Sequence, residues 1–128
     1  MIELKSVNQK YGGTQILWDL DLKIEKGSRT CIMGRNGVGK TTLLKTIMGL
    51  LPISSGSLTI NNRDMTKSRV EGRPEIGVGY VPQGRHIFPQ LTVEENLKIS
   101  LNCSRQSSRV IPPDIFSLFP VLKEMLQR

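Results

Sequence analysis

The stretch most suited to chemistry runs from Gly34 to Thr42 and reads GRNGVGKTT. Gly34, four further residues, and then Gly39, Lys40 and Thr41 match the spacing of a phosphate-binding loop. Glycines let consecutive backbone N–H groups turn toward a phosphate, because no side chain crowds them. The alternative, a glycine turn beside a surface lysine, would not require this full spacing. The loop therefore predicts a phosphorylated ligand.

Each polar residue of the loop has an expected role. Lys40 would reach the outer phosphates as a point charge, Thr41 would offer its hydroxyl to Mg²⁺, and Thr42 would bond an inner phosphate. The helix that follows would add its partial positive charge. The predicted ligand is a nucleoside triphosphate with Mg²⁺. The loop residues expected to surround its phosphates are Gly34, Asn36, Gly37, Val38 and Gly39.

The flanking sequence predicts the elements that position this loop. Residues 30–33, TCIM, form an unbroken apolar run, typical of a strand buried on both faces of a parallel sheet. After the loop, helical periodicity predicts a helix beginning near Gly39, and Gly49 and Pro52 mark its end. Its periodic apolar residues are Leu43, Leu44, Ile47, Met48 and Leu51.

The remaining segments predict an α/β protein. Residues 1–26 alternate apolar and polar side chains on either side of Gly12-Gly13, which indicates two antiparallel strands. Further strands are expected at residues 55–62, ending in a permissive Asn61-Asn62 turn, and at residues 76–83. The stretch between them, residues 63–74, is predicted as helix or loop.

The C-terminal third reads as helical. Thr92 and Glu95 have capping-box spacing at the start of an amphipathic helix. Residues 102–109 form a polar stretch that predicts a loop, and residues 112–128 predict two helices divided by Pro120.

Composition bears on whether the protein binds nucleic acid, spans a membrane or forms disulfides. The net charge of +7 is spread evenly, with nine basic and five acidic residues in 1–64 and nine and six in 65–128. Aromatic side chains are not interleaved with these charges, so no nucleic-acid partner is expected. No apolar run approaches the roughly 20 residues of a membrane-spanning helix, and we expect a cytoplasmic protein. Cys31 and Cys103 lack paired spacing, which predicts free thiols.

Separated motifs resemble the nucleotide-binding subunits of ATP-binding cassette (ABC) transporters. Tyr11 lies about twenty residues before the loop, where that family places an aromatic ring against adenine. The stretch GYVPQ ends in Gln83, which matches the family's Q-loop glutamine. Residues 86–97, HIFPQLTVEENL, resemble importers of branched-chain amino acids and of urea, and VPQGRHIFP with LFPVLKEMLQR is more similar to the urea type.

The resemblance implies a P-loop NTPase of ABC type that binds ATP and Mg²⁺. Lys40 and Gln83 would be catalytic, and Thr41 and Gln83 would contact the metal. From the residues alone, Tyr11 could instead be a core tyrosine, and Gln83 an ordinary exposed glutamine. His86 has no visible carboxylate partner, so an exposed loop histidine is favoured over a catalytic base.

The resemblance also implies a domain plan and partners. Residues 1–128 would be the N-terminal part of an ABC ATP-binding domain: an antiparallel β layer in 1–26, the P-loop core in 27–83, and the start of a helical subdomain in 84–128. Implied partners are transmembrane permease subunits, a second ATP-binding subunit in a homo- or heterodimer, and, indirectly, a periplasmic substrate-binding protein. The protein would sit peripherally on the inner face of the cell membrane.

Several parts of that family's catalytic machinery do not occur in this sequence. They are the Leu-Ser-Gly-Gly-Gln signature, an apolar strand ending in Asp and Glu, and the switch histidine; the signature would be expected within about ten residues after Arg128. We therefore expect an incomplete core, ATP binding without turnover, and a marginal or self-associating chain. Two alternatives are a soluble ABC ATPase of DNA repair or translation, and a non-catalytic ATP-binding fragment.

Overall fold

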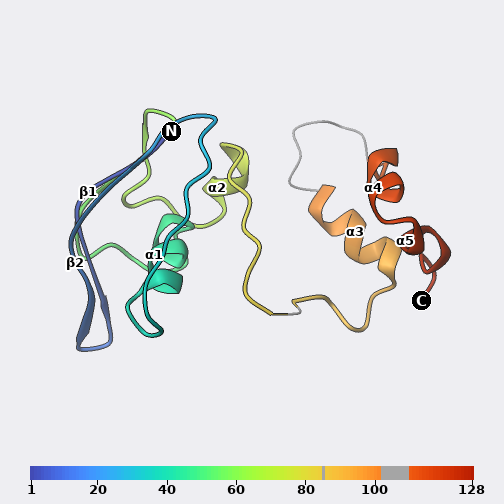
Figure 1. The fold of residues 1–128 in the computed structure, drawn as a ribbon, viewed down its shortest axis with the longest axis horizontal. Helices are drawn as coiled ribbons and strands as arrows, with labels where there is room; N and C mark the ends of the chain where they lie inside the picture. Colours follow the sequence, from blue (N-terminus) through green and yellow to red (C-terminus); the bar gives the residue numbers. More distant parts are fainter. Residues whose placement is uncertain (85, 102–109) are drawn as a thin grey trace. The chain divides into compact units, whose positions relative to one another are not determined.

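The computed structural model describes residues 1–84, 86–101 and 110–128. These residues form two compact units, Met1–Val78 and Gly79–Arg128, which are considered separately below (Figure 1). The polar loop predicted at 102–109, with Cys103, lies outside the described residues.

The first unit is built on one sheet with the strand order β2-β1-β3-β4. Strands β1 (Ile2–Tyr11) and β2 (Thr14–Ile24) are antiparallel and are joined by the Gly12-Gly13 turn, as predicted. Strand β3 (Ser55–Ile60) pairs with β1, which confirms the strand predicted after residue 55. Strand β4 (Arg63–Asp64) was not predicted, because its two residues lie in a segment interpreted as helix or loop.

Strand β1 contains a bulge that explains its broken alternation near Ser6 and Val7. Its pairing with β3 shifts register between Lys5 and Asn8, and Ser6 adopts a left-handed φ of 46°. The Ser6 N–H donates to the Asp21 carboxylate on β2 at 2.7 Å, so a side chain replaces the lost ladder bond. Gly56 lies on β3 opposite this bulge, close to the backbone of β1.

The turn between β3 and β4 follows directly from its sequence. Asn61 and Asn62 have φ values of 49° and 63°, and Ile60 pairs with Arg63 across them. Asparagine tolerates two successive left-handed positions better than most residues, which suits a two-residue hairpin loop. The predicted Asn61-Asn62 turn is confirmed.

Helix α1 (Lys40–Ile47) packs its apolar side on the sheet (Figure 1). It begins immediately after Gly39 and ends before Gly49, whose φ is 77°, as predicted. Burying each large aliphatic side chain contributes about 1.5–3 kcal/mol, so this shared core fixes the helix on the sheet. The core comprises Leu4, Val7, Leu17, Leu43, Ile47, Leu58, Ile60 and Met65.

Arg73 is an unexpected member of this interior. It lies in the short helix α2 (Gly72–Glu75) and is only 1% exposed. Its Nε donates to the Ile47 carbonyl at 2.8 Å, and its Nη2 donates to the Met65 carbonyl at 3.1 Å. Burial lowers the pKa of this guanidinium from its usual value. The side chain thereby ties the last turn of α1 to the segment that follows β4.

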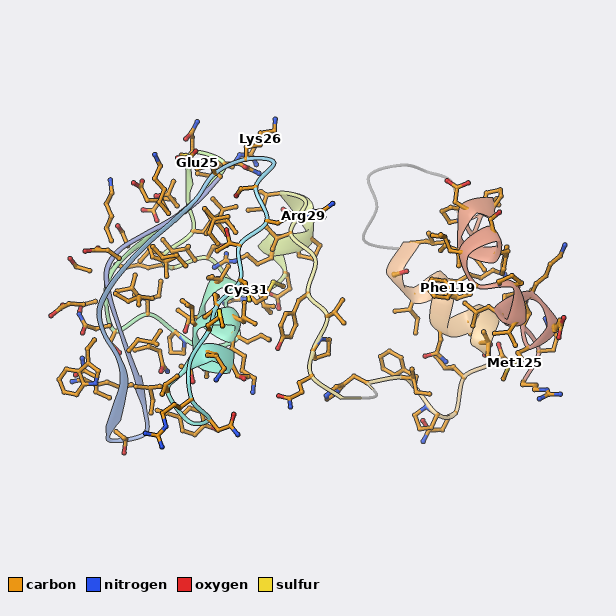
Figure 2. All side chains as sticks on the ribbon, in the orientation of Figure 1. Glu25, Lys26, Arg29, Cys31, Phe119 and Met125 are labelled. Atoms are coloured by element: carbon orange, nitrogen blue, oxygen red, sulfur yellow. The ribbon has the colours of Figure 1, made fainter. Side chains whose placement is uncertain are left out.

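Two predicted strands do not form. Residues 30–33 are irregular, and Met33 is 86% exposed, although Ile32 is half-buried against the core. Cys31 on this segment is a free, exposed thiol (Figure 2). Residues 76–83 are also irregular, with Val81 93% exposed. Among the described residues no strand pairs with either segment, and an apolar run becomes a buried parallel strand only between neighbouring strands.

The second unit is helical. It contains α3 (Val93–Leu101), α4 (Pro113–Leu118) and α5 (Pro120–Glu124), so the division at Pro120 is confirmed. The capping box is also confirmed: the Glu95 N–H donates to Thr92 Oγ1 at 3.2 Å, and the Thr92 N–H donates to the Glu95 carboxylate at 2.8 Å. The Leu126 carbonyl accepts a bond from the Glu94 N–H, which joins the C-terminal residues to α3.

Glu94 gives α3 a predicted pH dependence. Hydrogen bonds from Lys98 and Gln127, together with the Lys98 charge, hold the pKa of this carboxyl below its usual range. A lowered folded-state pKa adds stability above the unfolded pKa of about 4.3, and this stability is lost as pH falls through the folded value. We expect Glu94→Gln to lower the urea concentration at the midpoint of unfolding at pH 7. At pH 3 the same substitution should lower it much less. An equal loss at both pH values would contradict this assignment.

Candidate functional site

The predicted loop enters α1 through glycines with left-handed backbone. Gly37 has a φ of 85° and Gly39 a φ of 98°. A Cβ added at Gly39 would lie 3.1 Å from Ile16 Cγ2 and 3.2 Å from Leu17 Cδ2, both on β2. Gly39 is therefore constrained by backbone conformation and by the strand packed against it. Strand β2 supports the loop at the point where the helix begins.

Lys40 folds back over the loop that precedes it. Its Nζ donates to the Gly34 carbonyl at 2.7 Å and to the Arg35 carbonyl at 2.6 Å. The ammonium group is thus held at the loop, as the phosphate interpretation requires. Arg35 was not among the predicted site residues, and it takes part through its backbone carbonyl, which residue type cannot reveal.

The first turn of α1 offers backbone donors to an anion. The first helical bond runs from the Leu43 N–H to the Gly39 carbonyl at 2.8 Å, so the N–H groups of residues 40–42 have no partner within the helix. In the described part of the chain no side chain caps this end, and its first turn contains no acidic residue. The positive end of the helix dipole is therefore available to a negative group.

The other predicted loop residues are placed around this end of the helix. Thr41 is exposed and Thr42 is half-buried at the start of α1. The loop residues Gly34, Asn36, Gly37 and Val38 are exposed. The donor set of backbone amides, one ammonium group and two hydroxyls matches the chemistry of a phosphate chain. The residues present therefore fit the predicted ligand.

Tyr11 lies at the last position of β1 and is 68% exposed. The alternative of a core tyrosine does not fit this exposure. Tyr11 pairs with Thr14, and Leu17, which supports Gly39, pairs with Gln9 two residues before Tyr11. The ring is thus displayed on the hairpin whose second strand supports the loop. Its stacking on adenine stays a prediction.

Gln83 and His86 belong to the second unit, whereas Thr41 belongs to the first. Gln83 lies in a bend rather than at the end of a strand, and its side chain is exposed. The ring of His86 makes a 2.9 Å hydrogen bond to the Gln83 carbonyl and is exposed, as expected of a loop histidine. A magnesium site shared by Thr41 and Gln83 stays a prediction, since each unit is described by itself.

Comparison with known proteins identifies the family of this chain. Residues 17–125 match the family model described as ABC transporter. A probable branched-chain amino acid transport ATP-binding protein, LivF, from Archaeoglobus fulgidus is 42% identical over 100 residues, or 78% of this chain and 42% of the relative. The sulfate/thiosulfate import protein CysA from Vibrio cholerae is 36% identical over 126 residues, or 98% of this chain and 33% of the relative.

A solved structure agrees with these sequence matches. The ATP-binding cassette MJ0796, in a dimeric post-hydrolysis state bound to ADP and Pi, has 28% identity and a TM-score of 0.74. The match covers 84% of this chain and 50% of that chain. The predicted P-loop fold with an antiparallel layer is confirmed, as part of a full cassette. This chain spans less than half the length of the curated relatives named above, and it belongs to the ABC transporter family.

Proposed function

We propose that this chain is the ATP-binding part of an ABC importer subunit that binds ATP with Mg²⁺. The observation that carries the proposal is Lys40, which lies over the loop at an uncapped helix end. Backbone N–H groups of the loop and first turn would hold the phosphates, with the Lys40 ammonium closing over them. Tyr11 would stack on the adenine ring.

The Thr41 hydroxyl and the Gln83 side-chain oxygen are the proposed ligands of Mg²⁺, a metal that prefers oxygen donors. Bound MgATP would supply the phosphoanhydride whose hydrolysis resets a transporter. The sequence contains no signature motif and no Asp-Glu pair after an apolar strand. Positioning of the attacking water dominates phosphoryl transfer. We therefore propose that this chain alone binds MgATP without turning it over.

The proposed substrate of the whole transporter is a branched-chain amino acid or urea. The name of the Archaeoglobus fulgidus relative supports the amino acid, and residues 81–89 support urea by resemblance. The named sulfate importer shows that related subunits serve other cargo. In the described residues no helix is long and apolar enough to cross a membrane. The proposed partners are permease subunits at the inner membrane face, a second ATP-binding subunit and, indirectly, a periplasmic binding protein.

The test is calorimetric titration of the chain with MgATP, comparing Lys40→Ala with Lys45→Ala. Both variants remove a lysine from α1, but Lys45 lies in the last turn, away from the loop. Hydrogen bonds to charged groups contribute about 1.5–3 kcal/mol, so Lys40→Ala should bind about 10–100-fold more weakly. Lys45→Ala should bind like the unmodified chain. Equal affinity in both variants would reject the phosphate role of Lys40.

A further inference from the structure

One amide side chain on α3 holds a turn that lies after Gln83. The Asn96 Oδ1 atom accepts a bond from the Phe88 N–H at 2.9 Å. Its Nδ2 atom lies within hydrogen-bonding distance of the carbonyls of Phe88 at 3.0 Å, Leu91 at 3.1 Å and Thr92 at 3.0 Å. Asn96 therefore bonds both backbone groups of Phe88, as a paired strand residue would.

The turn of residues 88–91 is fixed from both ends. The Leu91 N–H donates to the Phe88 carbonyl at 3.1 Å, which closes the turn on itself. The turn and the residue before it expose large apolar side chains, with Ile87 69% and Phe88 54% exposed. Among the hydrogen bonds of the described residues, those of the Asn96 side chain join this turn to α3.

A hydrogen bond of His86 connects the residues before the turn to Gln83. The His86 ring is bonded to the Gln83 carbonyl at 2.9 Å, so the backbone at Gln83 is bonded to a residue that lies two positions before the turn. The segment is thus held at Gln83 by His86 and at α3 by Asn96.

We propose that Asn96 is a positioning residue that makes the 88–91 turn and α3 move as one body with Gln83. This inference rests on the proposed role of Gln83 as a ligand of the Mg²⁺ in bound MgATP. Asparagine suits the position because its amide both accepts and donates. A carboxylate at this position could still accept from the Phe88 N–H, but it would face three carbonyl oxygens without a donor.

The first test measures amide hydrogen exchange without nucleotide in Asn96→Asp, Asn96→Ala and a control, Asn62→Asp. The control makes the same chemical change in the exposed β3–β4 turn of the first unit. Exchange at Phe88 and Leu91 should become at least about tenfold faster in Asn96→Ala. Exchange at Leu91 should also become at least about tenfold faster in Asn96→Asp. In the control, the exchange rates at Phe88 and Leu91 should equal those of the unmodified chain. Unchanged exchange in both Asn96 variants would overturn the proposal.

Measuring the same exchange rates in acid distinguishes a lost hydrogen bond from lost packing. Below about pH 4 the introduced carboxyl is protonated and regains one donor. Exchange at Leu91 in Asn96→Asp should then slow relative to Asn96→Ala at the same pH. The rest of the sequence is the same in both variants, so the ratio of their exchange rates isolates the group at residue 96. A ratio that does not change with pH would count against the hydrogen-bonding role.

The second test adds MgATP. In the unmodified chain, MgATP should change the amide exchange rate at Gln83 and also in α3. In Asn96→Asp, MgATP should change the exchange rate at Gln83 but not in α3. A full response of α3 in Asn96→Asp, or no response of α3 in the unmodified chain despite Lys40-dependent binding, would overturn the coupling. If no Lys40-dependent binding is found, the proposed function fails, while the nucleotide-free test still decides whether Asn96 holds the turn.

Discussion

Replacing Gly56 with alanine is expected to lower the free energy of unfolding of the first unit by roughly 3–5 kcal/mol. The added Cβ would lie 2.3 Å from the Ser6 carbonyl oxygen and 2.5 Å from that of Lys5. Both are backbone atoms of the β1 bulge, so they cannot rotate away as a side chain would. The φ of 91° adds a second cost for any residue with a Cβ.

Gly77→Ala separates these two costs. Gly77 has a similar φ of 81°, but a Cβ there would meet no atom within 4 Å. This variant should therefore lose only about 1 kcal/mol, the cost of the backbone conformation. Urea unfolding followed by far-ultraviolet circular dichroism measures both variants. Since small domains have only about 5–15 kcal/mol of stability, Gly56→Ala should remove a large share of it. Equal losses in the two variants would show that the bulge does not constrain Gly56.

Arg73→Lys is expected to cost about 2–4 kcal/mol, although it preserves the charge. The guanidinium reaches the Ile47 and Met65 carbonyls with two nitrogens of one planar group. A single ammonium cannot reproduce that fork, so one carbonyl would lose its partner. The end of α1 would then be released from the segment after β4. The measurement is again urea unfolding of the first unit.

Two companion variants make the Arg73 prediction specific. Arg69→Lys makes the same change at an exposed position four residues earlier and should alter stability by less than about 0.5 kcal/mol. Arg73→Met removes the donors together with the buried charge, and with them the Nη1 atom, which has no hydrogen-bond partner among the described residues. Both carbonyls would then lack a donor, so its loss should be at least that of Arg73→Lys. A tolerated Arg73→Lys would mean that the guanidinium bonds contribute little.

The elements predicted correctly are those whose signals are local. The first hairpin shows alternation on both sides of Gly12-Gly13, helix α1 shows periodic apolar residues, and Thr92 with Glu95 forms a self-contained cap. Each of these patterns stabilises its own segment. The glycine loop before α1 belongs to the same group as a structural prediction, because its spacing encodes both the turn and the helix start.

The predictions that failed depend on other parts of the protein. Residues 30–33 and 76–83 have strand composition, but a parallel strand obtains its hydrogen bonds from neighbours that composition does not specify. Arg73 and Asn96 were missed for a related reason. Their types are usually exposed, and only the tertiary structure shows that backbone carbonyls surround them. A sequence pattern offered no signal for either.

Helix α1 is anchored at both of its ends, at Gly39 on β2 and at the Ile47 carbonyl by Arg73. Residues 28–38, which directly precede Gly39, form no helix or strand and, within the described residues, have no comparable anchor at both ends. A conformational change in that segment should therefore leave α1 in place. We therefore expect ligand binding to change the conformation of this segment more than that of the core.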